Sequence, residues 1–202
     1  MTVPYQCIVV GASAGGLQAL FSVLGALPAD FAIPILVAQH LLPREPSSLA
    51  AVLDARVGLR VVEACDKSAL RAGQVYVAVP DYHLSVEREV ADGQASYHVG
   101  LSQEPPDCFS RPAINVLFES AAVSTEGALI GVVLTGANDD GARGAACLKH
   151  WGGHLIVQEP SSAASSSMPL AALAAAVPDM VGTPSEIGSH LCKLGASNER
   201  RS

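Results

Sequence analysis

Continuous apolar runs, rather than alternating apolar and polar residues, mark the strands that this sequence predicts. Such runs are typical of parallel strands covered on both faces. Between many of them lie stretches with the spacing of an amphipathic helix, such as Leu17, Leu20 and Leu24. We therefore predict strands at 6–10, 33–39, 59–64, 74–79, 128–134 and 155–158, and helices at 15–27, 48–56, 112–120 and 140–150, from 169 and from 184.

One two-residue turn interrupts the alternation of strands and helices. Segments at 83–90 and 94–99 flank Asp92 and Gly93, which predicts an antiparallel hairpin. Elsewhere the alternation indicates parallel strands joined by right-handed crossovers. The predicted fold class is α/β, a doubly wound, mostly parallel sheet with helices on both faces and an antiparallel hairpin at an edge. The length fits a single domain at 1–202, with a core from about 6 to 194.

Local signals predict two helix starts and the end of the fold. Pro112 is expected at the first position of its helix, where a missing amide hydrogen does no harm. Thr183 and Glu186 form a capping box around Pro184, so the last helix is expected to start there. Residues 198–202 are predicted to be a frayed tail.

Charge and hydropathy exclude several classes of partner. The formal net charge is −7, whereas a nucleic-acid-binding surface is basic, so no nucleic-acid partner is expected. The sequence has no long uninterrupted apolar stretch, and residues 1–5 lack the basic start of a signal peptide. We therefore predict a cytoplasmic protein without membrane insertion.

The cysteines and histidines give no metal or disulfide pattern. Five cysteines are scattered along the chain without a CxxC pair, which predicts buried or partly buried free thiols in a reducing compartment. His150 and His154 have a metal-like spacing, but Gly152 and Gly153 interrupt any helix that would put them on one face. No metal site is predicted. Arg111 has two open interpretations, a contact with a substrate carboxylate or an ion pair within the domain.

The first strand ends in a serine flanked by glycines. Gly11, Ser13 and Gly15 match the pattern of a nucleophile elbow, in which a sharp turn between strand and helix exposes the hydroxyl. Amides at the start of the following helix would point toward whatever that hydroxyl attacks. A phosphate-binding or purely structural glycine turn would fit this stretch equally well.

The chief alternative is a nucleotide-binding α/β protein, because Gly11, Ser13 and Gly16 form a degraded dinucleotide fingerprint. Serine stands where close approach of a pyrophosphate favours glycine. Such proteins also carry an acidic residue at the end of the second strand, where this chain has Gln39 and His40. Both differences disfavour the alternative.

Two further strand ends supply partners for Ser13. His40 directly follows the second predicted strand, and Asp139 and Asp140 lie in the turn after the strand at 128–134. The carboxyl ends of parallel strands meet at one edge of a sheet, so these side chains are expected to converge. A hydroxyl, a base and an acid that orients the base are the parts of an activated nucleophile. The chain order differs from that of α/β-hydrolases.

Several motifs together resemble one family. They are similar, in the same order, to the signature segments of the catalytic domain of chemotaxis protein-glutamate methylesterases (CheB), and the resemblance extends from about 6 to about 194. The matching segments are 11–16, 39–40, 79–84, 111–112, 115–118, 134–136, 140–142 and 167–169.

The resemblance implies roles for individual residues. Ser13 would be the nucleophile, His40 the general base and Asp140 the third member, because Asp140 rather than Asp139 directly precedes a Gly-Ala pair. Backbone amides near Ala14 and Ala137 would hold the oxyanion. Here the chain departs from the family, which usually has Thr at position 14 and Met-Gly at positions 137–138.

The implied reaction is hydrolysis of glutamate methyl esters on the cytoplasmic helical bundle of a methylated chemoreceptor, through an acyl-enzyme and without a cofactor. The resemblance also implies a slower deamidation of receptor glutamine. A second hypothesis, motivated by Ala14 and Ala137, is a catalytically weakened docking module in a chemosensory signalling assembly.

Regulation is a further expectation from the resemblance. Members commonly carry a receiver domain before the catalytic domain, whereas residues 1–5 alone precede the first predicted strand here. We expect either a permanently open active edge or control by a separate response regulator.

Overall fold

A parallel sheet of seven strands forms the centre of the computed structural model, which describes residues 4–40 and 48–199. The strands lie in the order β3–β4–β2–β1–β7–β8–β9, and every neighbouring pair is parallel. β1 therefore has β2 on one side and β7 on the other. The strands are β1 (Cys7–Ala12), β2 (Ile35–Gln39), β3 (Arg60–Glu63), β4 (Gln74–Val77), β7 (Leu129–Val133), β8 (His154–Gln158) and β9 (Met180–Gly182).

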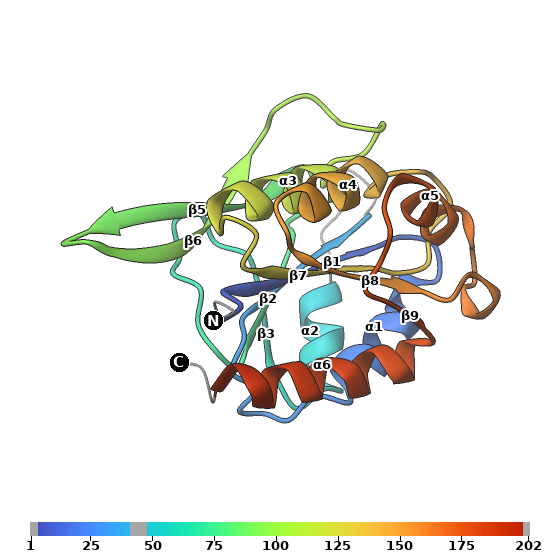
Figure 1. Cartoon of the computed structure of the whole chain (residues 1–202), viewed down its shortest axis with the longest axis horizontal. Helices are drawn as coiled ribbons and strands as arrows, with labels where there is room; N and C mark the ends of the chain where they lie inside the picture. The colour runs from blue at the N-terminus through green and yellow to red at the C-terminus, as the bar shows by residue number, and fades with distance from the viewer. Residues whose placement is uncertain (1–3, 41–47, 200–202) are drawn as a thin grey trace.

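Helices cover both faces of this sheet (Figure 1). One layer consists of α1 (Gly16–Leu24), α2 (Leu49–Asp54) and α6 (Pro184–Glu199), and the other of α3 (Ile114–Ser124), α4 (Ala142–His150) and α5 (Ser167–Ala175). The predicted fold class is confirmed. Among the described residues, no helix combines the length and the apolar character that a membrane span requires.

Burial on both faces explains the continuous apolar runs of the sequence. Along β1, Ile8 and Val10 pack in the core beneath α1, whereas Cys7 and Val9 pack in the core beneath α3. Successive strand residues point to opposite faces, so most positions of a strand covered on both faces are apolar. Phe118 of α3 is the largest fully buried side chain in the described parts of the molecule.

The predicted hairpin is present as a small sheet of its own. β5 (His83–Ala91) and β6 (Gln94–Ser102) are antiparallel, and Asp92 and Gly93 turn between them with φ of 52° and 76°. The segment between β3 and β4 joins the hairpin to that edge of the fold, because the amides of Lys67 and Leu70 donate to carbonyls of β6. In Figure 1 the hairpin extends beyond the layers.

The predicted start of α3 was wrong. Pro112 does not occupy the first helical position. It follows a cis peptide bond after Arg111, and the helix begins at Ile114. The carboxylate of Asp140, far away in sequence, accepts hydrogen bonds from the amides of Ile114 and Asn115. A tertiary contact therefore determines where this helix starts, and no local pattern could show it.

The end of the chain also differs from the prediction. Asn198 belongs to α6, and its side chain accepts a hydrogen bond from the amide of Tyr5 (2.6 Å) and donates one to the carbonyl of Tyr5 (3.1 Å). The rest of the predicted frayed tail, 200–202, lies outside the described residues. β9 was not predicted either, because its three residues are too few to form a pattern.

The five cysteines are free thiols, and four of them are buried or partly buried, whereas the expectation that all five would be so is wrong for the exposed Cys65. Complete burial raises the pKa of Cys7 to about 12, whereas Cys65 is exposed. Because the thiolate is the reactive form, Cys7 is doubly protected from thiol reagents.

We therefore expect Cys65 to react first with Ellman's reagent and Cys7 to react only on unfolding. In the native protein, the Cys65→Ser variant should lack the fastest phase of the reaction with Ellman's reagent. If mass spectrometry showed that Cys7 is labelled as fast as Cys65, the buried position of β1 would be contradicted.

Candidate active site

Ser13 lies in a tight turn between β1 and α1. Gly15 has φ of 77°, a conformation that other residues rarely adopt, and it leads directly into the helix. At Gly11 a Cβ atom would lie 2.3 Å from the Ile114 side chain, so only glycine lets α3 approach this closely. The Ser13 amide donates to the carbonyl of Thr135 (2.9 Å), which fixes the turn against the end of β7.

The partners of Ser13 arrive from the two neighbouring strands. His40 follows β2, and its amide donates to the carbonyl of Ala12 (3.1 Å). Asp140 lies in the turn between β7 and α4. Three adjacent central strands thus end at the same edge, on both sides of β1. This is the place where open α/β sheets bind ligands.

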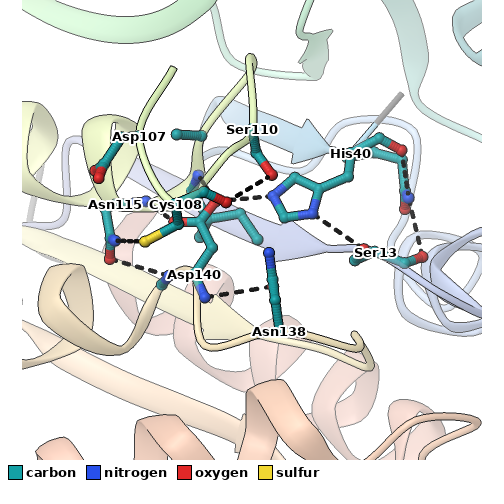
Figure 2. A network of polar contacts seen from close by, with 12 residues as sticks. Ser13, His40, Asp107, Cys108, Ser110, Asn115, Asn138 and Asp140 are labelled. Carbon is teal, nitrogen blue, oxygen red and sulfur yellow. Dashed lines mark hydrogen bonds and ion pairs between the residues drawn. The ribbon is translucent and has the colours of Figure 1, made fainter. Parts of the chain in front are cut away.

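A chain of hydrogen bonds connects the three side chains (Figure 2). His40 Nδ1 lies 3.0 Å from Ser13 Oγ, and His40 Nε2 lies 2.8 Å from Asp140 Oδ2. The Asp140 side chain is completely buried, and the His40 side chain is 14% exposed. The structure therefore brings together all three residues that the sequence predicted for this site.

The surroundings of Asp140 determine which nitrogen of His40 carries the proton. The carboxylate already accepts amide hydrogen bonds from Ile114 (2.7 Å) and Asn115 (2.9 Å), so it acts as an acceptor toward Nε2–H as well. The lone pair is then on Nδ1, which faces the Ser13 hydroxyl. In the chymotrypsin arrangement the two ring nitrogens have the opposite roles.

Only one of the two neighbouring aspartates contacts His40. Asp139 is exposed, whereas Asp140 points into the site. The side chain of Asn138 accepts a hydrogen bond from the amide of Asp140 (3.3 Å) and so supports the turn. Of the two residues that the strand pattern left open, Asp140 has the geometry of an orienting acid.

Asn115 is a supporting residue that the sequence analysis did not assign. Its side-chain oxygen accepts hydrogen bonds from the amides of Gly141 (3.0 Å) and Gly144 (2.9 Å) at the start of α4. Asp140, just before α4, caps α3 in return. The two helices thus cap each other, and the carboxylate is held from both sides.

Gln39 is a second such residue. Its side-chain nitrogen donates to the carbonyls of both Ser13 (2.9 Å) and His40 (3.1 Å). Gln39 is buried, and its side-chain oxygen has no partner among the described residues. One amide therefore joins the backbone of Ser13 to that of His40. In the sequence, Gln39 is marked by its place at the end of an apolar strand and within the matching family segment 39–40, and neither shows what it binds.

Two residues in the turns after β1 and β7 have backbone amides that donate no hydrogen bond within the described residues. They are Ala14 and Ala137, and both are exposed. Ala14 directly follows Ser13, and Ala137 lies in the turn after β7, whose Thr135 holds Ser13.

Other candidates from the sequence have structural partners. Arg111 forms an ion pair with Asp81 (2.6 Å), which supports the second of its two interpretations. His154 faces His190 with 3.3 Å between their Nε2 atoms. In residues 4–40 and 48–199 there is no group of three or more histidine, cysteine or acidic residues that could hold a metal ion.

Comparison with known proteins agrees with this geometry. The model of the family described as CheB methylesterase matches residues 8–191. The chain belongs to the CheB methylesterase family. A crystal structure of the Thermotoga maritima CheB methylesterase catalytic domain superposes with a TM-score of 0.88 and 31% sequence identity, covering 95% of this chain and 100% of that one.

Relatives of different lengths match the same region. A Leptospira interrogans protein, whose name provisionally assigns protein-glutamate methylesterase and protein-glutamine glutaminase activity, is 39% identical over 96% of this chain and 97% of its own length. The Caulobacter vibrioides protein-glutamate methylesterase/protein-glutamine glutaminase 2 is 38% identical, and the matched region covers 55% of its length. CheB-type domains therefore occur both in proteins of about this length and within longer ones.

The contacts of Gln39 generate a prediction about the nucleophile. Gln39→Leu keeps the size of the side chain but removes both hydrogen bonds, so the separation of Ser13 and His40 is no longer fixed. We expect the rate at which a fluorophosphonate labels Ser13 to fall by about 10- to 100-fold, as for other small misplacements of reacting groups.

The matched control is Gln18→Leu, the same change at an exposed position of α1. It should label at the rate of the unmodified protein. An equal labelling rate for Gln39→Leu, at an unchanged melting temperature, would show that the double hydrogen bond does not position the nucleophile.

Proposed function

We propose that this chain is a serine esterase that hydrolyses glutamate methyl esters on the cytoplasmic domain of a methylated chemoreceptor. The observation that carries the proposal is the continuous hydrogen-bond chain from Ser13 through His40 to the buried Asp140. Membership of the CheB methylesterase family supports the substrate class. The five free thiols fit the cytoplasm as the compartment.

In the proposed first step, Nδ1 of His40 removes the proton of the Ser13 hydroxyl as its oxygen attacks the side-chain carbonyl of the ester. Nε2–H remains hydrogen-bonded to Asp140, and the carboxylate stabilises the imidazolium that forms. His40 then returns the proton to the departing methoxide, and methanol leaves. The glutamyl group remains as an ester on Ser13.

The second step repeats the first with water. His40 removes a proton from a water molecule, which attacks the acyl-enzyme and releases the glutamate carboxylate and the Ser13 hydroxyl. The same steps would convert a glutamine side chain, with ammonia as the leaving group. Ammonia leaves less readily than methanol, so we propose deamidation as the slower activity.

The tetrahedral intermediates need donors for their oxyanion. We propose the amides of Ala14 and Ala137, because both are exposed and unused among the described residues. In serine hydrolases one such donor contributes about 3–4 kcal/mol. An alanine keeps the backbone amide, so the departures from the usual family residues at these positions do not remove the donors.

The second candidate function is the docking module with weakened catalysis, which the same departures favour. The two functions differ in turnover and not in binding, so one assay separates them. For control of the activity, a permanently open active edge and a separate response regulator both remain our proposals.

The proposal predicts release of methanol from a methyl-labelled receptor. Ser13→Ala and His40→Ala should each remove nearly all of it, since in a comparable triad such losses reach about 10⁶-fold in kcat. Binding of the receptor should persist in both variants. A purified wild-type protein that binds the receptor and releases no methanol would favour the docking module instead.

The contacts of Asp140 predict that substitution of Asp140 lowers the activity far more than substitution of Asp139. In Asp140→Asn the amide would face Nε2, which favours the tautomer with its proton on Nδ1, where the lone pair is needed. In a comparable triad the loss of the aspartate costs about 10⁴-fold in kcat. Asp139→Asn should retain full activity. Because Asp140 also caps α3, circular dichroism must show that both variants are folded. Equal activity of the two folded variants would refute the assignment of Asp140 as the residue that orients His40.

A further inference from the structure

An unusual turn lies in the loop between β6 and α3, which stands above α3 and α4 in Figure 1. Asp107 and Ser110 exchange two backbone hydrogen bonds of 3.2 and 2.9 Å across a turn of two residues. These residues, Cys108 and Phe109, have φ of 47° and 61°. Two-residue turns of this kind favour asparagine and glycine, so a bulky aromatic here is held in a disfavoured conformation.

The two side chains of the turn have opposite environments. The sulfur of Cys108 is partly buried and accepts a hydrogen bond from Asn115 (3.4 Å). The ring of Phe109 is fully exposed. A large apolar side chain gains nothing from solvent, and the turn that holds it is conformationally strained, so the isolated fold gives no reason for a phenylalanine at this position.

The loop that carries Phe109 is held at its base. Arg111 donates to Asp81 and to the carbonyls of Gln103 and Glu104. His83, buried in β5, is within hydrogen-bond distance of the carbonyl of Pro105 (3.1 Å). These contacts fix the chain on both sides of the turn.

The turn itself is fixed against the catalytic scaffold. Arg143 of α4 binds the carboxylate of Asp107 (2.5 Å). Asn115, which donates to Cys108, also accepts from the amide of Gly141 next to Asp140. Burial and the nearby carboxylates of Asp140 and Asp107 raise the pKa of the Cys108 thiol. Figure 2 shows Asp107, Cys108 and Ser110 around the side of the triad formed by His40 and Asp140.

We propose that Phe109 is a docking residue for the protein substrate, and that it packs against an apolar side chain of the methylated receptor segment near the ester. This inference rests on the proposed function. A rigid aromatic side chain surrounded by polar residues is the usual form of a binding hot spot, because little conformational freedom is lost on contact. Asp107, Arg111 and Arg143 are already paired within the chain, so the proposed contact is assigned to the ring and not to these charges.

Because Phe109 is outside the reacting groups, its loss should affect KM for the receptor and not kcat. Phe109 is not part of the hydrogen-bond chain of Ser13, His40 and Asp140. It can therefore contribute binding energy for a macromolecular substrate, whereas a small ester presents no second apolar side chain for the ring to contact. Loss of the ring should raise KM for the receptor and leave kcat and the small ester unaffected.

The test compares Phe109→Asn and Phe109→Trp with the unmodified protein. Asparagine accepts the turn conformation and removes the ring, so this variant should fold. We expect KM for a methylated receptor fragment to rise by about tenfold or more, as when a hot-spot aromatic is lost. Hydrolysis of the γ-methyl ester of an N-acetylglutamate amide should not change. Phe109→Trp should restore the receptor KM.

Val177→Ser is the control, since Val177 is 83% exposed and precedes β9, an end strand of the sheet, in a different segment from the loop that carries Phe109. It should leave both substrates unaffected. The inference is overturned if Phe109→Asn leaves the receptor KM unchanged, if it slows both substrates equally, or if its effect is confined to self-association measured by sedimentation.

A binding measurement separates this inference from the proposed function. In the Ser13→Ala background, Phe109→Asn should weaken binding of the methylated fragment by the same factor, and unchanged binding would overturn the docking role. If the unmodified protein releases no methanol from either substrate, the esterase proposal fails, and the binding comparison still decides the role of Phe109.

Discussion

The buried carboxylate of Asp140 holds the start of α3 and the His40 side chain in their positions. Asp140 has no exposed surface, and its two oxygens accept hydrogen bonds from His40, Ile114 and Asn115. An unpaired carboxylate in such a place would destabilise the fold by several kcal/mol, whereas a hydrogen bond to a charged group contributes about 1.5–3 kcal/mol. The partners are therefore as necessary to the fold as to the chemistry. Removal of any of them leaves a buried charge incompletely satisfied.

The same contacts connect the helix layer to the strand ends. α3 can begin at Ile114 because Asp140 accepts its first amides, and α4 begins where Asn115 accepts the amides of Gly141 and Gly144. The absence of a side chain at Gly11 lets Ile114 approach β1. A shift of α3 would thus move the carboxylate, and with it His40. Packing of the core and alignment of the site depend on one set of interactions.

The parts of the structure that follow a local pattern were predictable from the sequence. Continuous apolar runs identified the central strands, and their carboxyl ends pointed to Ser13, His40 and the pair Asp139 and Asp140, from which the family resemblance selected Asp140. The start of α3 was not predictable, because its cap comes from a residue 26 positions away. The supporting role of Gln39 likewise requires that β1 and β2 be neighbours. A polar residue that binds backbone carbonyls has no spacing rule of its own, so its partners emerge only in three dimensions.

The hydrogen bonds between Tyr5 and Asn198 have a consequence for how this fold is used in larger proteins. They place the beginning of β1 and the end of α6 together, at the amino edge of the sheet, whereas Ser13 lies at the carboxyl edge. A polypeptide fused at either end would enter and leave on the side away from the nucleophile. The fold can therefore be joined to other domains through either end without a change in the residues at the carboxyl edge of the sheet.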